Sequence, residues 1–229
     1  MLYRSRSIYF QDGLATVHAA GFQQDPHFLE AYRLAKLTGS FGNWDTTWRT
    51  YVCCWAAMKG REVAGDLVEC GVNLGGYSRA VAHYIDLDKL DKKMWLLDTF
   101  DGLVGEQITP AERKAGIARG QYVECFERAQ WNFVGINNVR FVRGRIPETL
   151  TEVDADQVSY LSIDMNCVEP EIAAANYFWD RLSSGAVIVL DDYGWARHIE
   201  QRNAFDKFAS DKGVTILALP TGQGLIIKP

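Results

Sequence analysis

The stretch DLVECGVNLGGYSRA, residues 66–80, joins a predicted strand to a glycine-rich turn and a predicted helix. Leucine and valine at the centre of residues 66–70 indicate the strand, and the glycines that follow let the backbone pass close to a ligand. The first turn of the helix leaves backbone N–H groups free at the same place. This order of elements is typical of an α/β fold that binds its ligand beyond the carboxyl ends of parallel strands.

The alternation of strand and helix patterns continues to the C-terminus. Strands are predicted at 66–70, 93–98, 139–142, 158–164, 186–191, 214–218 and 224–228, and helices near 76–87, 109–134, 168–182 and 196–211. The turn at 220–224 is too short for the crossover of a parallel pair, so the last strand must run antiparallel. The sequence therefore predicts a mostly parallel sheet with helices on both faces.

The first 60 residues show a helical pattern instead. Pro26 is placed to open one helix and Gly39 to close it. From 46 to 59, aromatic and apolar residues cover most of a helix surface, which predicts burial against the main domain or a second subunit. We therefore divide the chain into a helical cap or dimerisation region at 1–60 and an α/β domain at 61–229, and expect a homodimer.

Composition excludes several classes of function. The chain has 229 residues, of which 48% are hydrophobic and 23% charged, as in ordinary folded domains. Its 24 basic residues are scattered among 29 acidic ones, so nucleic acid is not an expected partner. No apolar run approaches the roughly 20 residues that a bilayer needs, and no signal peptide is recognised, so we expect a cytoplasmic protein without a membrane partner. The five cysteines lack a C-x-x-C spacing, which predicts buried, reduced thiols.

The end of the first strand and the end of the second predict a nucleoside pocket. Glu69 and Gly71 lie at the glycine-rich turn, and Asp98 ends the next strand, where an acid can accept both hydroxyls of a ribose. The dinucleotide fingerprint G-x-G-x-x-G is not met, because Asn73 takes the place of its middle glycine. An NAD-linked oxidoreductase is therefore the weaker interpretation.

Three acidic residues follow two very apolar strands. Asp164 ends the strand at 158–164, and Asp191 and Asp192 end the strand at 186–191. If these strands are neighbours, the carboxylates converge, and two like charges about 4 Å apart repel by roughly 4 kcal/mol at an effective dielectric near 20. Oxygen ligands select a hard ion, so the cluster predicts Mg²⁺ or Mn²⁺. The alternative is that Asp192 caps the following helix and Asp191 is solvated at the strand end.

Five segments together resemble the macrocin-type O-methyltransferases: DLVECGVNLGGYSRA, MWLLDTFDGL, YLSIDMN, SSGAVIVLDDYG and LPTGQGLIIK. These enzymes use S-adenosylmethionine and a metal ion to methylate sugar hydroxyls in antibiotic biosynthesis. The resemblance covers residues 65–229 and implies a Rossmann-like class I methyltransferase fold, with S-adenosylmethionine and Mg²⁺ (or Mn²⁺) as cofactors. It also implies a hydroxylated small molecule, expected to be a sugar, as the acceptor.

The resemblance also implies roles for individual residues. The ligands of the metal would be Asp164, Asp191 and Asp192. The methionine part of the cofactor would lie on the turn, its ribose on Asp98, and its adenine near the residues that follow the third strand. The full cofactor-binding set is Glu69, Gly71, Asn73, Gly75, Gly76, Tyr77, Ser78, Asp98, Gly144 and Arg145.

The proton acceptor is left open by one departure. Related catechol-type enzymes have a lysine base three positions after the first metal-binding aspartate, and here that position is Cys167. The candidates for the catalytic base are Asp164 and His198, unless the metal suffices alone. Trp44, Trp48 and Trp195 are candidates for an aromatic wall, although core packing explains Trp48 better, and Arg197 fits a solvated position better than an acceptor contact. A nucleoside- and metal-binding module without catalysis remains the alternative function.

Overall fold

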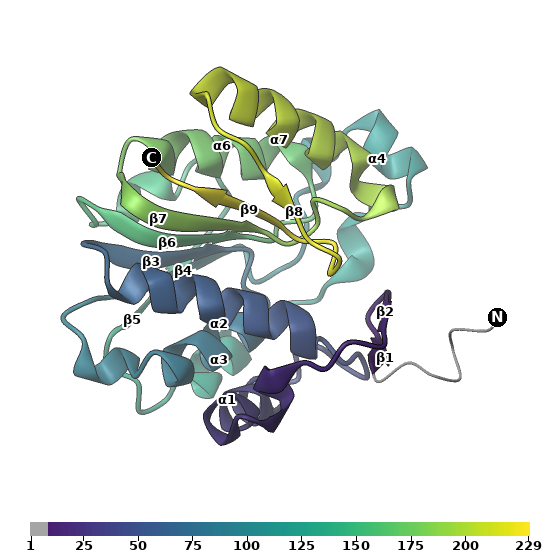
Figure 1. The fold of residues 1–229 in the computed structure, drawn as a ribbon. Helices are drawn as coiled ribbons and strands as arrows, with labels where there is room; N and C mark the ends of the chain where they lie inside the picture. The colour runs from purple at the N-terminus through teal and green to yellow at the C-terminus, as the bar shows by residue number, and fades with distance from the viewer. Residues whose placement is uncertain (1–8) are drawn as a thin grey trace.

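The computed structural model describes residues 9–229. A seven-stranded sheet lies in the middle, with helices packed on both of its faces (Figure 1). Its strands are β3 Asp66–Cys70, β4 Met94–Asp98, β5 Val139–Arg143, β6 Val158–Ile163, β7 Leu182–Leu190, β8 Leu217–Ala218 and β9 Gly224–Ile227. The α-helices are α1 Pro26–Leu37, α2 Thr47–Arg61, α3 Gly76–Tyr84, α4 Pro110–Lys114, α5 Phe126–Asn132, α6 Val168–Trp179 and α7 Ile199–Lys212.

The sheet order is β5-β4-β3-β6-β7-β9-β8, and β9 runs antiparallel to both of its neighbours. This confirms the predicted mostly parallel sheet with an antiparallel last strand. The chain crosses from β3 to β4 on one side and continues to β6 on the other, so the order reverses at β3. The carboxyl ends of β3 and β6 therefore flank the crevice in which α/β proteins bind ligands.

Two apolar cores fill the space between sheet and helices. One contains Phe28 of α1, Cys53 of α2 and Val81 of α3, and the other contains Phe178 of α6 and Phe205 of α7. Every residue of β6 is buried, as expected for a central strand covered on both faces. The sheet is thus a rigid platform that fixes the positions of its strand ends.

The N-terminal region differs in part from the prediction. Asp25 accepts a hydrogen bond from the backbone of His27 at 3.0 Å and Pro26 is the first residue of α1, as predicted. Ahead of α1, however, β1 Tyr9–Gln11 and β2 Leu14–Thr16 form a hairpin that the helical pattern did not reveal. Its turn, Asp12-Gly13, has positive φ at both residues, and Asp-Gly is the dipeptide that such turns prefer.

The apolar side of α2 packs on β6 and β7 of the same chain. The segment at 46–59 was predicted to be buried against the main domain or a second subunit, and these contacts are with the main domain. The division at residue 60 and the homodimer stay predictions.

The helix predicted at 109–134 is broken in two. Thr109 and Glu112 form a reciprocal capping box that starts α4, but α4 ends at Lys114, and Gly116 follows with a φ of 90°. The chain then passes through a short 3-10 helix at Arg119–Gln121 before α5 begins. Among residues 9–229, six short 3-10 helices lie between the longer elements, at Gly21–Gln24, Leu87–Lys89, Gly105–Gln107, Arg119–Gln121, Leu150–Glu152 and Ala196–His198.

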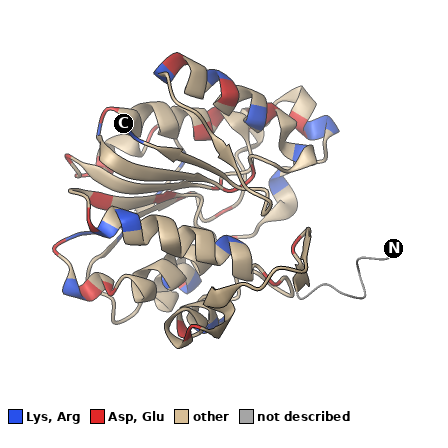
Figure 2. Cartoon of the chain, viewed as in Figure 1, with Lys and Arg blue, Asp and Glu red and all other residues tan. Residues whose placement is uncertain are grey.

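Residues of opposite charge are interspersed along the helices and loops in the view of Figure 2. All five cysteines are free, and Cys125 is the only one that is not fully buried. Among residues 9–229, none of the helices combines the length and the apolar character that a bilayer crossing requires.

Candidate active site

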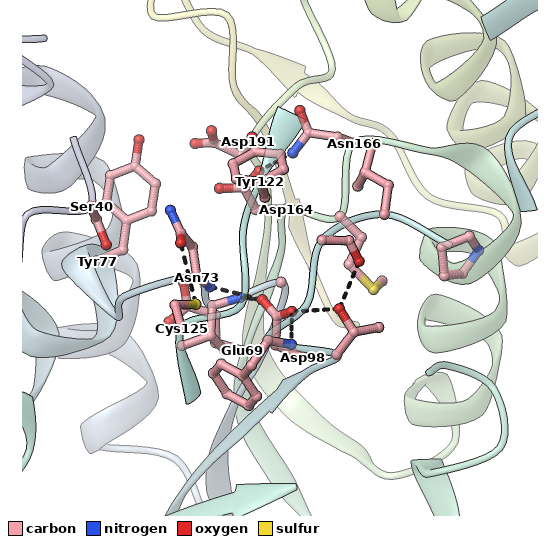
Figure 3. A pocket seen from close by; sticks show the side chains of 18 of the residues that line it. Ser40, Glu69, Asn73, Tyr77, Asp98, Tyr122, Cys125, Asp164, Asn166 and Asp191 are labelled. Atoms are coloured by element: carbon pink, nitrogen blue, oxygen red, sulfur yellow. Dashed lines mark hydrogen bonds between the residues drawn. The ribbon is translucent and has the colours of Figure 1, made fainter. Parts of the chain in front are cut away.

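A cavity of about 300 Å³ opens at the carboxyl ends of β3, β4, β6 and β7 (Figure 3). One half is lined by the glycine-rich turn after β3 and by Asp98. The other half is lined by the three aspartates and by residues from the loops around Trp44 and Tyr122. The volume is within the range of small-molecule sites. The cavity therefore joins the two groups of residues that the sequence singled out.

Gly71 lets the turn pass next to β6. Its φ is 90°, and a Cβ atom at this position would lie 1.9 Å from the carbonyl oxygen of Asp164. Its own N–H donates to the carbonyl of Leu97 at 2.9 Å. Only glycine fits both the conformation and the space, so the end of β3 stays in contact with the segment that carries Asp164.

Asp98 lies below the same turn. One of its carboxylate oxygens accepts hydrogen bonds from the backbone N–H groups of Val72 at 2.6 Å and Asn73 at 2.7 Å (Figure 3). The other accepts from the N–H of Phe100 at 2.8 Å and from the hydroxyl of Thr99 at 3.3 Å. Asp98 thus fixes the shape of the turn, and the Thr99 hydroxyl is the longest contact that a ribose would have to displace.

Glu69 presents a buried carboxyl group to the cavity, where it accepts a hydrogen bond from the hydroxyl of Ser78. Burial raises the pKa of Glu69 well above its ordinary value, and the charges of Asp191 and Asp98 raise it further. A ligand that brings a positive charge would compensate the ionised form. The amino group of a methionine moiety has that character.

The other predicted cofactor residues divide into two groups. Those that line the cavity are Asn73, Gly76, Tyr77 and Gly144. Gly75, Ser78 and Arg145 do not line it: Gly75 ends the turn with a φ of 83°, and Arg145 is exposed and pairs with Glu106 and Glu148. A contact of Arg145 with adenine is therefore not supported by its position.

Asp164, Asp191 and Asp192 lie at the other end of the cavity. Each offers a carboxylate oxygen, and these atoms all lie within 4.8 Å of one another. Asp164 directly follows β6 and the other two follow β7, which pairs with β6 in parallel. Neighbouring parallel strands end at the same edge of the sheet, so residues 27 positions apart in sequence come together here.

The electrostatics of this cluster favour a cation. Burial and the charge of Asp191 raise the pKa of Asp164 well above its ordinary value and that of Asp192 to about 7. The Oδ2 atom of Asp192 is buried without a hydrogen-bond partner among the described residues. The three side chains offer only oxygen ligands, and one of these oxygens lacks a hydrogen-bond partner. Such a site fits a hard divalent ion such as Mg²⁺.

Asp191 also has partners that the sequence did not reveal. Its Oδ2 accepts from Nη1 of Arg49 at 2.6 Å, and its Oδ1 accepts from Nε2 of Gln223 at 2.9 Å. Arg49 belongs to α2 and Gln223 to the turn before β9. Gln223 lies in the segment LPTGQGLIIK, but neither residue was singled out as a site residue, because it is the packing of α2 and β9 against β7 that brings both here.

His198 lies behind Asp192 and does not line the cavity. Gln201 donates to Glu171 at 2.7 Å, so its carbonyl oxygen accepts from Nδ1 of His198. Nε2 then faces Oδ2 of Asp192 at 3.8 Å, and burial lowers the pKa of the imidazole. A neutral imidazole with its proton on Nδ1 has no N–H to donate to Asp192, and His198 lies outside the cavity lining, so this position does not favour a base that touches the acceptor. A direct catalytic role for His198 stays a prediction.

Cys167, at the position of the lysine base in the catechol-type enzymes, lines the cavity. Burial raises the pKa of its thiol above the ordinary value. A neutral thiol does not accept a proton from a hydroxyl, which leaves Asp164 as the base candidate that lines the cavity.

The three tryptophans have different surroundings. Trp44 lines the cavity and is 69% exposed. Trp48 packs edge-on against Tyr9 and Phe22, as expected for a core residue. Trp195 lies outside the cavity lining, and Arg197 is exposed. Trp44 and Tyr122 are thus aromatic residues of the cavity lining, and Tyr122 lies near Asp164 and Asn166 (Figure 3).

The fold resembles solved methyltransferases over most of the chain. The O-methyltransferase NovP aligns with a TM-score of 0.68 at 22% identity and covers 79% of both chains. The calicheamicin methyltransferase CalS11 aligns with a TM-score of 0.61 at 16% identity and covers 92% of this chain and 94% of its own. The protein therefore has the Rossmann-like class I methyltransferase fold that the sequence predicted.

Residues 49–217 match the family model of the macrocin-O-methyltransferases (TylF), and the chain belongs to this family. The demethyldecarbamoylnovobiocin O-methyltransferase of Streptomyces niveus is 29% identical over 61% of this chain. The 8-demethyl-8-(2,3-dimethoxy-alpha-L-rhamnosyl)-tetracenomycin-C 4'-O-methyltransferase of Streptomyces olivaceus is 31% identical over 57% of it. The matches span 57% and 54% of these relatives, a little over half of their lengths.

Proposed function

We propose that the chain is an S-adenosylmethionine-dependent O-methyltransferase that requires a divalent cation and acts on a hydroxyl of a sugar or polyhydroxylated small molecule. One observation carries the proposal: a single cavity joins the glycine-rich turn and Asp98 at one end to the three aspartates at the other. A donor bound on the turn and a hydroxyl bound at the aspartates would therefore face each other.

Methyl transfer from a sulfonium is an in-line displacement, so the protein must mainly align two substrates and remove a proton. A divalent ion held by Asp164, Asp191 and Asp192 would lower the pKa of an acceptor hydroxyl beside it. Glu69 and the turn would hold the methionine part of the donor, and Asp98 its ribose.

Asp164 is the proposed proton acceptor. It lines the cavity at the end where the three aspartates meet, so its carboxylate would lie beside an acceptor hydroxyl bound there. Asn166 donates to its Oδ1 at 3.3 Å and would keep the carboxylate directed into the cavity. His198 lies outside the cavity lining and is therefore the weaker candidate for this role.

A glycosylated natural product is the proposed acceptor class. The printed names of the two Streptomyces relatives concern a novobiocin precursor and a rhamnosyl tetracenomycin. In this chain, Trp44 and Tyr122 supply aromatic faces at the acceptor side of the cavity. Aromatic rings suit the apolar face of a sugar or a polyketide.

Transfer of label tests the proposal. The chain is incubated with methyl-tritiated S-adenosylmethionine, Mg²⁺ and a panel of O-glycosides with free sugar hydroxyls, and binding of S-adenosylhomocysteine is measured by calorimetry. We expect transfer that EDTA abolishes and Mg²⁺ restores. Absence of S-adenosylhomocysteine binding would contradict the cofactor assignment. Binding without transfer to any glycoside would instead support the non-catalytic binding module.

A further inference from the structure

Arg49 occupies a partly buried position between the N-terminal hairpin and the acidic cluster. Its Nε and Nη2 atoms donate to the two oxygens of Asp12 at 2.6 and 2.9 Å, and its Nη1 donates to Asp191 at 2.6 Å. The side chains are 16%, 5% and 3% exposed for Arg49, Asp12 and Asp191. Ion pairs this buried lose much more than surface pairs when one partner is removed.

The cluster is held from two sides. Arg49 contacts one oxygen of Asp191 and Gln223 contacts the other, so this carboxylate has little freedom to rotate. The hairpin is seated close by, since a Cβ atom at Gly13 would lie 3.3 Å from the ring of Trp195. That ring lies 5.6 Å from the guanidinium carbon of Arg49. Hairpin, guanidinium and strand end thus form one packed unit.

The positive charge of Arg49 also affects the electrostatic potential at the three aspartates. Among the described residues that line the cavity, Arg49 is the one Lys or Arg, against the five carboxylates of Glu69, Asp98, Asp164, Asp191 and Asp192. Its positive charge opposes the binding of a cation at the aspartates, and the paired charge of Asp12 offsets this opposition. Removing Arg49 or Asp12 therefore changes the potential at the cluster in opposite directions.

We propose that Arg49 is a positioning residue that fastens the β1–β2 hairpin to the acidic cluster and sets the affinity of that cluster for a divalent cation. The inference rests on the cation site of the proposed function. The family match begins at residue 49, so Asp12 lies outside the matched region.

Manganese binding to the full chain tests the electrostatic part. Mn²⁺ is titrated at pH 7.5 without S-adenosylmethionine or acceptor, and free Mn²⁺ is followed by electron paramagnetic resonance. We expect Arg49→Gln to bind Mn²⁺ at least three-fold more tightly and Asp12→Asn about three-fold more weakly. Arg49→Lys keeps the charge and should stay within two-fold of the wild type. Arg33→Gln, which breaks an exposed pair with Glu30, is the matched control and should change nothing.

Hydrogen exchange tests the mechanical part in the absence of metal. We expect amide exchange over residues 9–16 to accelerate at least ten-fold in Arg49→Gln and in Asp12→Asn, and to stay unchanged in Arg33→Gln. If Arg49 only holds the hairpin and Asp191 in place, both Arg49→Gln and Asp12→Asn should bind Mn²⁺ more weakly. That result overturns the proposal. So does unchanged exchange over the hairpin, or a wild-type chain that binds no Mn²⁺. Expected shifts in Mn²⁺ affinity without methyl transfer to any glycoside would overturn the proposed function instead.

Discussion

The two halves of the cavity are built in different ways. The half proposed to bind the cofactor comes from one continuous stretch, Glu69–Tyr77, and from Asp98, which accepts hydrogen bonds from the backbone of Val72 and Asn73. The half proposed to bind the acceptor takes Arg49 from α2, Tyr122 from the loop between α4 and α5, and the aspartates from two strand ends. The first half is thus specified by a local motif and the second by the packing of distant segments. Substitutions in the two halves should therefore affect different quantities.

The largest effect is expected at Gly71, where the two halves touch. In Gly71→Ala, a Cβ atom would meet the backbone of Asp164 at 1.9 Å and the positive φ would be strained. We expect the free energy of unfolding to fall by at least about 3 kcal/mol, measured by urea denaturation. Gly116→Ala is the matched control, with the same φ of 90° but open space around it, and should lose about 1–2 kcal/mol. Equal losses would show that the contact between the halves is unimportant.

The next effect separates chemistry from cofactor binding. Asp164→Asn keeps the size of the side chain but removes the proposed proton acceptor and one charge of the cluster. We expect kcat to fall about 10²–10⁴-fold, with the affinity for S-adenosylhomocysteine unchanged. Kinetics and calorimetry together measure this. Full activity of the variant would remove Asp164 from the mechanism, and a parallel loss of S-adenosylhomocysteine binding would mean that the halves are not independent.

The buried carboxyl of Glu69 gives the cofactor half a pH dependence. Its pKa in the folded state is raised from 4.5, so above pH 4.5 the folded state retains a proton that the unfolded state has released. The free energy of unfolding should therefore fall as pH rises through this window, by at most about 1.4 kcal/mol per pH unit for one proton. In Glu69→Gln this contribution is absent, so its stability should depend less on pH between 5 and 8 in urea denaturation. Exposed Glu62 provides the control, and Glu62→Gln should keep the wild-type slope.

The smallest effect concerns the rim of the acceptor half. Trp44→Ala removes an aromatic face from the cavity, and we expect the acceptor KM to rise about 2- to 10-fold while S-adenosylhomocysteine binds as before. Trp131→Ala is the control, because Trp131 is 75% exposed and lies outside the lining. An unchanged KM in Trp44→Ala would mean that the acceptor does not contact this ring.

Several features of the site follow from sequence because they depend on a few adjacent residues. The bounds of β3 agree with the predicted strand at 66–70, and Glu69, Gly71 and Asp98 line the cavity. The hairpin at Asp12-Gly13 also had a local signal, the Asp-Gly dipeptide, which the helical pattern of the following segment obscured. In the same way, Gly116 was a signal against a single helix over 109–134.

Other features had no such signal. Arg49 and Gln223 were not singled out as site residues, and the sequence did not show that His198 lies outside the cavity lining. Arg145 follows β5 as predicted, yet its side chain turns to the surface and pairs with Glu106 and Glu148. The direction of a long side chain depends on which partner lies within reach, and that is decided by elements far away in the chain.

By itself the sequence determined the order of strands and helices, the glycine-rich turn and the acids that end three of the strands, because periodicity and turn chemistry act over a few residues. Only the tertiary structure decided that the three aspartates lie together and that Arg49 bonds both Asp191 and Asp12. It also decided that His198 lies next to Asp192 but outside the cavity lining. Those relations depend on which strands pair and on how α2 and the hairpin pack against them. Packing of this kind is a property of the whole fold, since each contact exists only when many distant contacts are formed together.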